Sequence, residues 1–478
     1  MYTYCCRPCL SRATFLSQAF PGAFSMITRR QSMLGSLAFG GLASSAFGKS
    51  QLSKAIASAM PVSTGYGNLI KDKNSLLDLP EGFSYRVISA FGDTMSDGLH
   101  VPDRADGMGC FALDEERVAL VRNHELHPTH IEKQPQSIQQ HSHSLAYDTY
   151  DQGSQFEGIA LPGGTSTLVY NLATQSVERE FISLSGTVRN CSGGITPWGT
   201  WLTCEESVDK PNGVVNKEHG YIFEVPASAT SMIQPNPLKA MGRFNHEAAS
   251  VDPRSGMVYL TEDRGDSVLY RFIPNTPSKL ADGGQLQALK VVSKPQFDSR
   301  NWNRPSMATG QWFDIEWVDL ENPESPEDDL RIQAYEKGAA LFARGEGMHW
   351  GDGELYFCCT NGGEKQLGQV MRVVPSVDGS ADKLQLFLQS EDKNLYNFGD
   401  NLTVCPNGHL LVCEDQYTDV VDNHLRGITP QGEVYNFAKL HAQTELAGAC
   451  FSPDGSTLFV NVYSPTKTLA ITGPWLSH

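Results

Sequence analysis

The chain has 478 residues and is 40% hydrophobic, with 44 glycines and 26 prolines, which is enough apolar sequence to bury a large core. Its formal net charge of −17 argues against a nucleic-acid partner and against an anionic membrane surface. No apolar run reaches the ~18 residues that a membrane-spanning helix needs, so we expect no membrane insertion.

The first 46 residues have the features of an export leader. They contain four arginines and no acidic residue, and the pair Arg29-Arg30 precedes a weakly apolar run, Met33–Phe47. A basic start, an apolar stretch and small residues near Ala46 are typical of a secretory signal, and adjacent arginines favour the twin-arginine export machinery. We therefore predict cleavage near Ala46 and a periplasmic or extracellular location.

The start of the leader leaves an alternative open. Met26 would give a signal of ordinary length, so residues 1–25 are interpreted as an optional extension from an upstream start codon. After the leader, we expect one domain over residues 60–474.

This domain repeats one local pattern and has almost no helical periodicity. A short strand, a turn containing Gly, Pro or Asp, and a second strand ending in a polar residue recur six times. The six stretches are 106–125, 190–206, 247–263, 346–361, 400–415 and 445–461. Together with further strands between them, they predict an all-β fold, a six-bladed β-propeller with loop insertions at Asn301–Glu336 and Gln134–Glu157. A different all-β repeat is the alternative.

Eight cysteines remain after the leader. Seven lie in or beside apolar strand-like runs, which predicts small buried hydrophobic side chains; they are Cys110, Cys204, Cys358, Cys359, Cys405, Cys413 and Cys450. Cys191 differs, because it lies in the turn-rich segment Arg189–Trp198.

Acids and amides fill equivalent positions of the repeats. The first positions are Asp106, Asn190 or Cys191, Glu247, Glu346, Asp400 and Glu445. The second strands end at Asn123 or Glu125, Glu205 or Glu206, Glu262 or Asp263, Asn361, Glu414 or Asp415, and Asn461. The innermost strands of a propeller face its axis, so we expect these side chains to converge. Converging carboxylates repel one another unless a cation neutralises them, which indicates bound metal.

The residue types narrow the choice of metal. Carboxylate and amide oxygens favour Ca²⁺, whereas a thiolate from Cys191 would suit a transition metal. Arg344, in the turn Ala343–Gly347, adjoins Glu346 and would suit a tetrahedral oxyanion such as phosphate. A structural salt bridge from Arg344 to a neighbouring blade is the alternative.

Several motifs resemble the PhoX alkaline phosphatases, in the same order and over about residues 67 to 471. They are Val121–Glu125, Gly163–Thr167, Arg189–Gly194, Thr196–Glu206, Asn245–Glu247, Ala343–Gly347, Glu445–Gly448 and Ser452–Gly455. The most specific is the stretch from Cys191 to Glu206, C-S-G-G-x-T-P-W-G-T-W-x-x-C-E-E.

The resemblance implies a six-bladed propeller that holds Fe³⁺ and Ca²⁺, and export in the folded state through the twin-arginine route. It implies that Cys191 binds iron and that Arg344 binds phosphate. It also implies metal binding by acids at matching positions, which are Glu206, Glu247, Glu346 and Glu445. The repeat pattern adds Glu262 and Asp400 as candidate ligands, leaves open whether Glu205 or Glu206 coordinates, and offers Asn123 as a hydrogen-bond donor to substrate.

The predicted function is therefore an exported alkaline phosphatase, a monomer that hydrolyses small-molecule phosphate monoesters by metal-assisted in-line attack. Two alternatives remain open. One is a calcium-dependent propeller hydrolase of another ester, phytase-like or lactonase-like, which would need no cysteine ligand. The other is a calcium-stabilised binding propeller, which would not need Arg344.

Overall fold

The computed structural model describes residues 65–133, 149–153, 161–416 and 418–476. All the described residues belong to one compact unit, Met60–His478. The predicted export leader lies outside the described residues, as does most of Gln134–Glu157.

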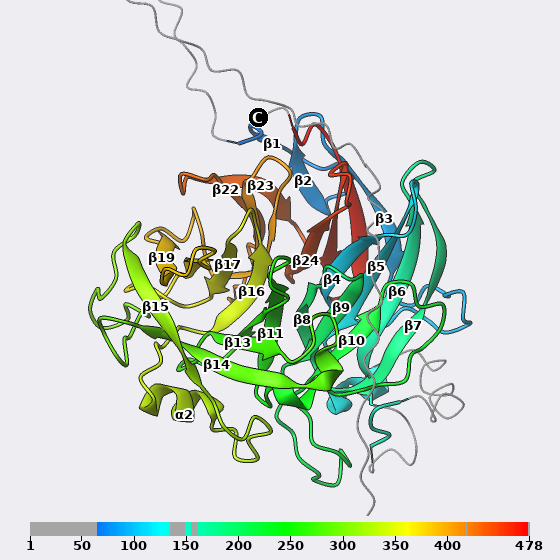
Figure 1. Cartoon of the computed structure of the whole chain (residues 1–478). Coiled ribbons are helices and arrows are strands. Elements are labelled where there is room, and N and C mark those ends of the chain that lie inside the picture. The colour runs from blue at the N-terminus through cyan, green and yellow to red at the C-terminus, as the bar shows by residue number, and fades with distance from the viewer. Residues whose placement is uncertain (1–64, 134–148, 154–160, 417, 477–478) are drawn as a thin grey trace, which may run out of the picture. The chain divides into compact units, whose positions relative to one another are not determined.

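The described residues form five antiparallel sheets (Figure 1). The first contains β4 (Ala105–Ala112), β5 (Arg117–His124), β6 (Gly163–Asn171) and β7 (Ser176–Thr187), and the second β8 (Asn190–Ile195), β9 (Thr200–Glu205) and β10 (Ile222–Pro226). The third has nine strands in the order β11 (His246–Val251), β12 (Val258–Glu262), β13 (Tyr270–Pro274), β14 (Gly284–Val291), β15 (Trp312–Asp319), β19 (Asp382–Gln389), β18 (Gln369–Val374), β17 (Leu355–Cys359) and β16 (Gly345–Trp350).

The last two sheets come from both ends of the described chain. The fourth contains β20 (Gly399–Val404), β21 (Leu410–Glu414), β22 (His424–Ile428), β23 (Val434–Leu440), β2 (Leu77–Pro80) and β1 (Leu69–Ile70). The fifth contains β24 (Leu446–Phe451), β25 (Thr457–Val462), β26 (Lys467–Thr472) and β3 (Ser84–Ala90). Helical segments among the described residues are short: η1 (Pro128–Lys133), η3 (Lys239–Met241), η4 (Leu280–Asp282) and α2 (Leu330–Glu336).

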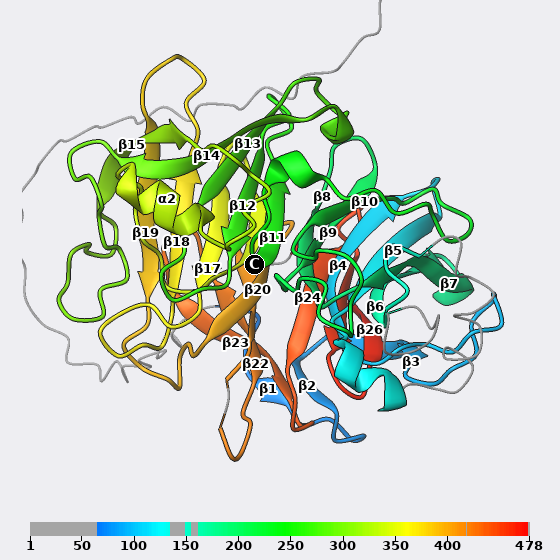
Figure 2. The same cartoon turned by 90° about the horizontal axis from the view of Figure 1, so that it is seen from below.

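Six strands form a closed inner ring. β4 contacts β8, and the contacts continue through β11, β16, β20 and β24 back to β4; Figure 2 shows most of these strands around the middle of the unit. The pairing of β3 with β26 joins the two ends of the described chain in one sheet. The all-β, propeller-like class is confirmed. Hydrogen bonding nevertheless groups the strands into five sheets, because β15 pairs with both β14 and β19.

The segment Asn301–Glu336 is more regular than predicted. We expected an insertion or a long loop, but the segment contains strand β15 and helix α2. Alternate residues Phe313 and Ile315 of β15 are buried, so the strand has the two-residue period of a half-buried sheet. Prolines and acids on both sides of this short period hide it in the sequence.

The cysteine prediction is confirmed. All eight cysteines of the described residues are buried, and none forms a disulfide. The predicted turns are present too: the amide of Gly256 donates to Asp252 O (2.8 Å), and Gly256, Gly408 and Gly455 all have positive φ, the conformation that glycine adopts most easily.

A β-bulge interrupts each of the six inner strands near its start, directly after the first paired residue in five strands and after the second in β24. Between two paired positions the inner strand has one residue more than its partner. The first bulged residues are Asp106, Cys191, Glu247, Glu346, Asp400 and Gly448. Because a bulge re-aims a side chain out of the regular alternation, five of these bulges can direct an acid or a thiol toward the inner ring.

Candidate metal centre

Eight side chains form three groups that could hold metal ions, and two of the groups share Asp400. The groups are Glu125 with Cys191 and Glu206; Glu247 with Glu346 and Asp400; and Asp400 with Asp415 and Glu445. Within each group, one ligand atom from every residue lies within 4.8 Å of the others.

Two kinds of position supply these side chains. One is the first residue of a bulge, as at Cys191, Glu247, Glu346 and Asp400. The other is the residue directly after the second strand of an inner hairpin, as at Glu125, Glu206 and Asp415. Glu445 belongs to neither kind, because it directly precedes β24, and the bulge of that hairpin begins only at Gly448. Our assignment of Glu445 to the first repeat position was therefore wrong in register, although its side chain reaches the third group.

Glycines let the inner strands approach closely enough to bring the acids together. A Cβ on Gly107 would lie 2.6 Å from Cα of Ser192, and a Cβ on Gly347 would lie 2.6 Å from Cα of Asn401. Each glycine is the second residue of its bulge, directly after Asp106 or Glu346. Any side chain at these two positions would push neighbouring inner strands apart.

Two of the buried acids at the inner ring have carboxylate oxygens without a partner in the part of the chain that the structure describes. Both carboxylate oxygens of the fully buried Glu247 lack a hydrogen-bond partner among the described residues, as does Oδ1 of Asp106. Burial, reinforced by repulsion from Glu346 and Asp400, raises the pKa of Glu247 well above its usual range. Burial and neighbouring carboxylates raise the pKa values of further acids in the same way; these are Asp106, Glu346, Asp400 and Glu445. A buried carboxylate with no partner is costly, and a bound cation would remove that cost.

Cys191 lies among these acids. Its Sγ is 3.7 Å from Oδ2 of Asp106. Burial, with Asp106 and Glu247 nearby, raises the pKa of the Cys191 thiol well above its usual range. The thiolate form needed for metal ligation thus requires a nearby positive charge.

Arg344 connects two neighbouring hairpins beside the second group. Its guanidinium donates to both carboxylate oxygens of Asp263 (2.7 and 2.8 Å) and to Oε1 of Glu346 (2.9 Å). Burial lowers the pKa of Arg344, but the carboxylates of Glu346 and Asp263 raise this pKa by more, so the guanidinium stays charged. The salt bridge that the sequence left as an alternative is present, and it lies next to candidate metal ligands.

Two further arginines occupy the position of Arg344 in other hairpins, and the sequence analysis missed them. Arg104, Arg189 and Arg344 each precede a bulged residue by two positions, and all have positive φ. Arg189 donates to Oε1 of Glu125 (2.8 Å) and to Glu206, and Arg104 donates to the hydroxyl of Tyr463 (2.8 Å). The spacing Arg-x-Asp, Arg-x-Cys and Arg-x-Glu was the available signal.

Three predicted site residues do not join the groups. Glu205 accepts hydrogen bonds from Nδ1 of His219 (2.6 Å) and from three backbone amides. Glu262 accepts from the hydroxyl of Tyr270 (2.8 Å) and lies 3.5 Å from Nη1 of Arg331.

Asn123, offered as a donor to substrate, instead holds the bulge that carries Cys191. Its amide donates to the carbonyls of Cys191 (3.0 Å) and Ser192 (2.7 Å). Its Oδ1 accepts from Trp201 and Thr203, both at 2.8 Å. These contacts leave Asn123 no free N–H for a substrate.

A cavity of about 530 Å³ opens beside the first and third groups. Its lining includes the three acids Glu125, Asp415 and Glu445, and the two arginines Arg104 and Arg189. This volume is in the range of small-molecule sites. Acids able to hold cations, arginines able to hold oxyanions and an adjoining cavity together define a class: a propeller-like protein with the parts of a metal-dependent hydrolase.

Comparison with known proteins identifies the family. The model of the family described as alkaline phosphatase PhoX matches residues 64–466. The chain is also similar to the structure of Pseudomonas fluorescens PhoX in complex with vanadate, a transition state analogue, with 18% identity and a TM-score of 0.62 over 84% of this chain and 96% of that one. The chain belongs to the PhoX family of alkaline phosphatases and is a phosphoric monoester hydrolase.

Other comparisons add little. The likeness to XC5397, a gluconolactonase of Xanthomonas campestris, has 12% identity and a TM-score of 0.36 over 81% of this chain and 98% of that one, which is too weak to carry an argument. No curated protein sequence matches the chain. None of the helices in the described ranges is long and apolar enough to cross a membrane.

Proposed function

We propose that the chain is an exported alkaline phosphatase that hydrolyses phosphate monoesters at a mixed iron and calcium centre within the inner ring of strands. The observation that carries the proposal is Glu247, a fully buried carboxylate whose two oxygens have no hydrogen-bond partner among the described residues. Its neighbours Glu346 and Asp400 are acids as well, so a cation is the partner that this group lacks.

The ligand types divide the three groups between two metals. The groups around Asp400 contain carboxylates alone, the donor set that Ca²⁺ prefers. The group of Glu125, Cys191 and Glu206 adds a sulfur ligand, which Ca²⁺ does not use and a transition metal such as iron does. The ions would supply positive charge that neutralises the phosphate oxygens and would favour deprotonation of an attacking water.

The residues of the chain orient the substrate and balance its charge. Arg344 and Arg189 each form ion pairs with acids of the groups. Cations bound to these acids would free the guanidinium groups to donate to the oxygens of a phosphate ester. A planar guanidinium can donate two parallel hydrogen bonds to phosphate, and charge that spreads over the phosphate oxygens in the transition state strengthens those bonds.

The blade count belongs to the same proposal. We interpret the nine-stranded sheet as two blades, β11–β14 and β16–β19, joined by the inserted strand β15. With the four other sheets this gives six blades, one for each strand of the inner ring. The sequence of the leader supports export through the twin-arginine machinery, which suits an enzyme that acts on esters outside the cytoplasm.

Metal removal tests this function against the alternatives. The full mature protein is assayed on a phosphate monoester before and after treatment with a chelator, and again after Ca²⁺ and iron are restored. We expect complete loss and at least partial recovery of hydrolysis. Hydrolysis that survives metal removal would contradict the proposal, and a binding propeller would show none at any stage.

A further inference from the structure

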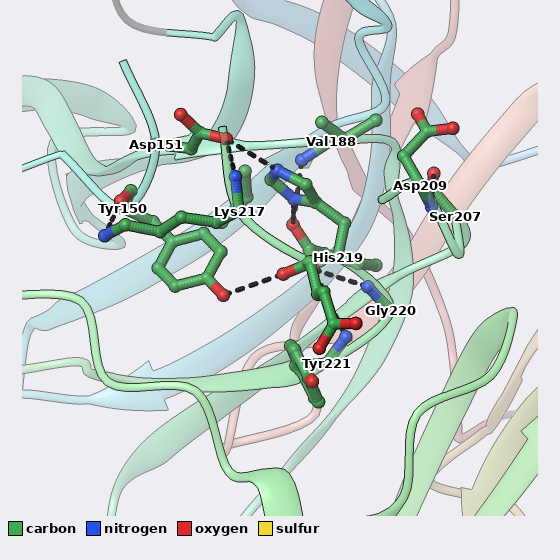
Figure 3. A network of polar contacts seen from close by, with 12 residues as sticks. Tyr150, Asp151, Val188, Ser207, Asp209, Lys217, His219, Gly220 and Tyr221 are labelled. Atoms are coloured by element: carbon green, nitrogen blue, oxygen red, sulfur yellow. Dashed lines mark hydrogen bonds and ion pairs between the residues drawn. The ribbon is translucent and has the colours of Figure 1, made fainter. Parts of the chain in front are cut away.

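A buried histidine lies between two carboxylates behind the candidate metal centre. Nδ1 of His219 is 2.6 Å from Oε1 of Glu205, and Nε2 is 3.3 Å from Oδ2 of Asp151; Figure 3 shows the ring directed toward Asp151. All three side chains are almost fully buried. An imidazole that faces a carboxylate at both nitrogens donates from both and is therefore protonated.

The charge balance agrees with this geometry. Burial lowers the pKa of His219, but Glu205 and Asp151 raise it more, to about 9. Asp151 is itself fixed, because its Oδ2 also accepts from the amides of Asn216 (2.7 Å) and Lys217 (2.9 Å). The imidazolium is thus held on one side by a rigid anion and holds Glu205 on the other.

Glu205 in turn fixes the backbone on both sides of the first group. Its Oε1 accepts from the amide of Val188 (3.0 Å), three residues before Cys191. Its Oε2 accepts from the amides of Gly220 (2.8 Å) and Tyr221 (3.2 Å). Its own chain continues directly into Glu206, whose amide donates to the carbonyl of Arg189 (2.8 Å).

We propose that His219 is a positioning residue for the metal centre: it holds the Glu205 carboxylate in the place from which that carboxylate presents Cys191 and Glu206 to a metal ion. The inference rests on the proposed function in one respect, that Cys191 and Glu206 bind metal. Without the imidazolium, Glu205 would be a buried carboxylate with no cationic partner. It would rearrange, and the backbone at Val188 and Glu206 would lose its common anchor.

The test compares metal retention by three variants of the full mature protein. His219→Gln removes the charge, and Asp151→Asn removes one of the two carboxylates that hold it. His441→Gln is the matched control, because Nε2 of His441 also lies 2.8 Å from a carboxylate, that of Asp78, at the edge formed by β2 and β23. The readouts are the EDTA concentration that removes half of the bound iron and calcium, and the thermal midpoint.

We expect His219→Gln to lose iron at ~10–100-fold lower EDTA, the usual effect of removing a partner of a metal ligand. Asp151→Asn should shift in the same direction by less, and His441→Gln should match wild type. A lower thermal midpoint with unchanged metal retention would show a merely structural role and overturn the proposal. If His219→Gln does not fold, Asp151→Asn decides on the same readout. Wild-type protein that retains no metal would instead refute the proposed function itself.

Discussion

Three pairs of adjacent acids allow the inside of the sheets to be compared with the centre of the ring, because the two members of each pair have different surroundings. The pairs are Glu205-Glu206, Glu262-Asp263 and Glu414-Asp415, and in each the first residue ends the second strand of an inner hairpin. The first member is completely buried and has a protein cation within 3.5 Å: His219, Arg331 or Arg426, respectively. We call Glu205, Glu262 and Glu414 the sheet glutamates.

The second members meet a different environment. Glu206 and Asp415 belong to candidate metal groups, and Asp263 binds Arg344 beside them. Side chains of successive strand residues point to opposite sides, so one step along the chain exchanges an acid with a protein partner for an acid that faces other acids. The comparison teaches that each sheet glutamate has a protein cation of its own, whereas the acids of the three groups outnumber the two arginines, Arg189 and Arg344, that pair with them.

The largest expected effect is on activity, and it comes from comparing Glu247, an acid without a protein partner among the described residues, with the sheet glutamate Glu262. Glu247→Gln removes an acid whose two oxygens have no partner, so we expect hydrolysis to fall below detection. The metal-free variant should also be more stable than metal-free wild type, because the repulsion from Glu346 and Asp400 is reduced. Denaturation in the presence of a chelator measures this.

Glu262→Gln is the matched control, since Glu262 is equally buried but accepts a hydrogen bond from Tyr270. It should lose stability and keep most of its activity. Equal activity loss in both variants, or a less stable metal-free Glu247→Gln, would refute the distinction between the two kinds of acid.

Arg344→Lys is expected to have the next largest effect. Lysine keeps a point charge but loses the fork that now holds Asp263 at both oxygens. If the fork acts on charge that develops in the transition state, kcat and kcat/KM should both fall by about 10²–10³. A variant with normal metal content that loses only thermal stability would leave Arg344 as a structural salt bridge.

Glu414→Gln should show how much a sheet glutamate contributes to the free energy of unfolding. Glu414 lies 2.7 Å from Nε of Arg426, and both side chains are buried. Removing one partner of a buried ion pair leaves the other charge uncompensated and costs about 3–5 kcal/mol. Urea denaturation measures the change; a loss below about 1 kcal/mol, the value of an exposed pair, would mean that Arg426 finds another partner.

The smallest expected effect concerns pH. The pKa of His219 is raised from 6.5 to about 9, so the folded state binds its proton more tightly than the unfolded state does. The stability that this provides is fully present below about pH 6.5 and is lost as pH rises through about 9. The thermal midpoint of wild type should therefore fall more between pH 7 and 10 than the thermal midpoint of His219→Gln does. Parallel curves would contradict a charged His219.

Sequence patterns predicted most of the fold because its turns and alternation are local. Strand β15 was not predicted because its short stretch of two-residue periodicity lies between prolines and acids. Among site residues, Cys191 and Arg344 stand in motifs specific enough to single out. The choice between Glu205 and Glu206 stayed open because adjacent identical residues differ only in the face of the strand on which they lie. That choice depends on the exact last paired residue, which sequence periodicity does not define.

Other site residues could be assigned correctly only from the three-dimensional structure. The bulges, not the strand starts, direct Asp106 and its equivalents toward the inner ring, and this is why Glu445 was matched to the wrong position. Arg189 was missed as an arginine of the candidate metal centre because its partners, Glu125 and Glu206, come from two different hairpins. Asn123 was wrongly offered as a substrate donor because all four partners of its side chain come from the next hairpin, which only the folded chain brings near; they are Cys191, Ser192, Trp201 and Thr203.

The central claim is that Cys191 and the acids of the inner ring hold a mixed iron and calcium centre that hydrolyses phosphate monoesters. Metal analysis with a visible spectrum of purified wild type and of Cys191→Ser tests it most directly, with Cys450→Ser, a buried cysteine outside the groups, as the control. We predict iron and calcium in wild type, a violet colour from thiolate-to-iron charge transfer, and loss of colour and activity together in Cys191→Ser but not in Cys450→Ser. A colourless, fully active wild type that contains only calcium would contradict the account.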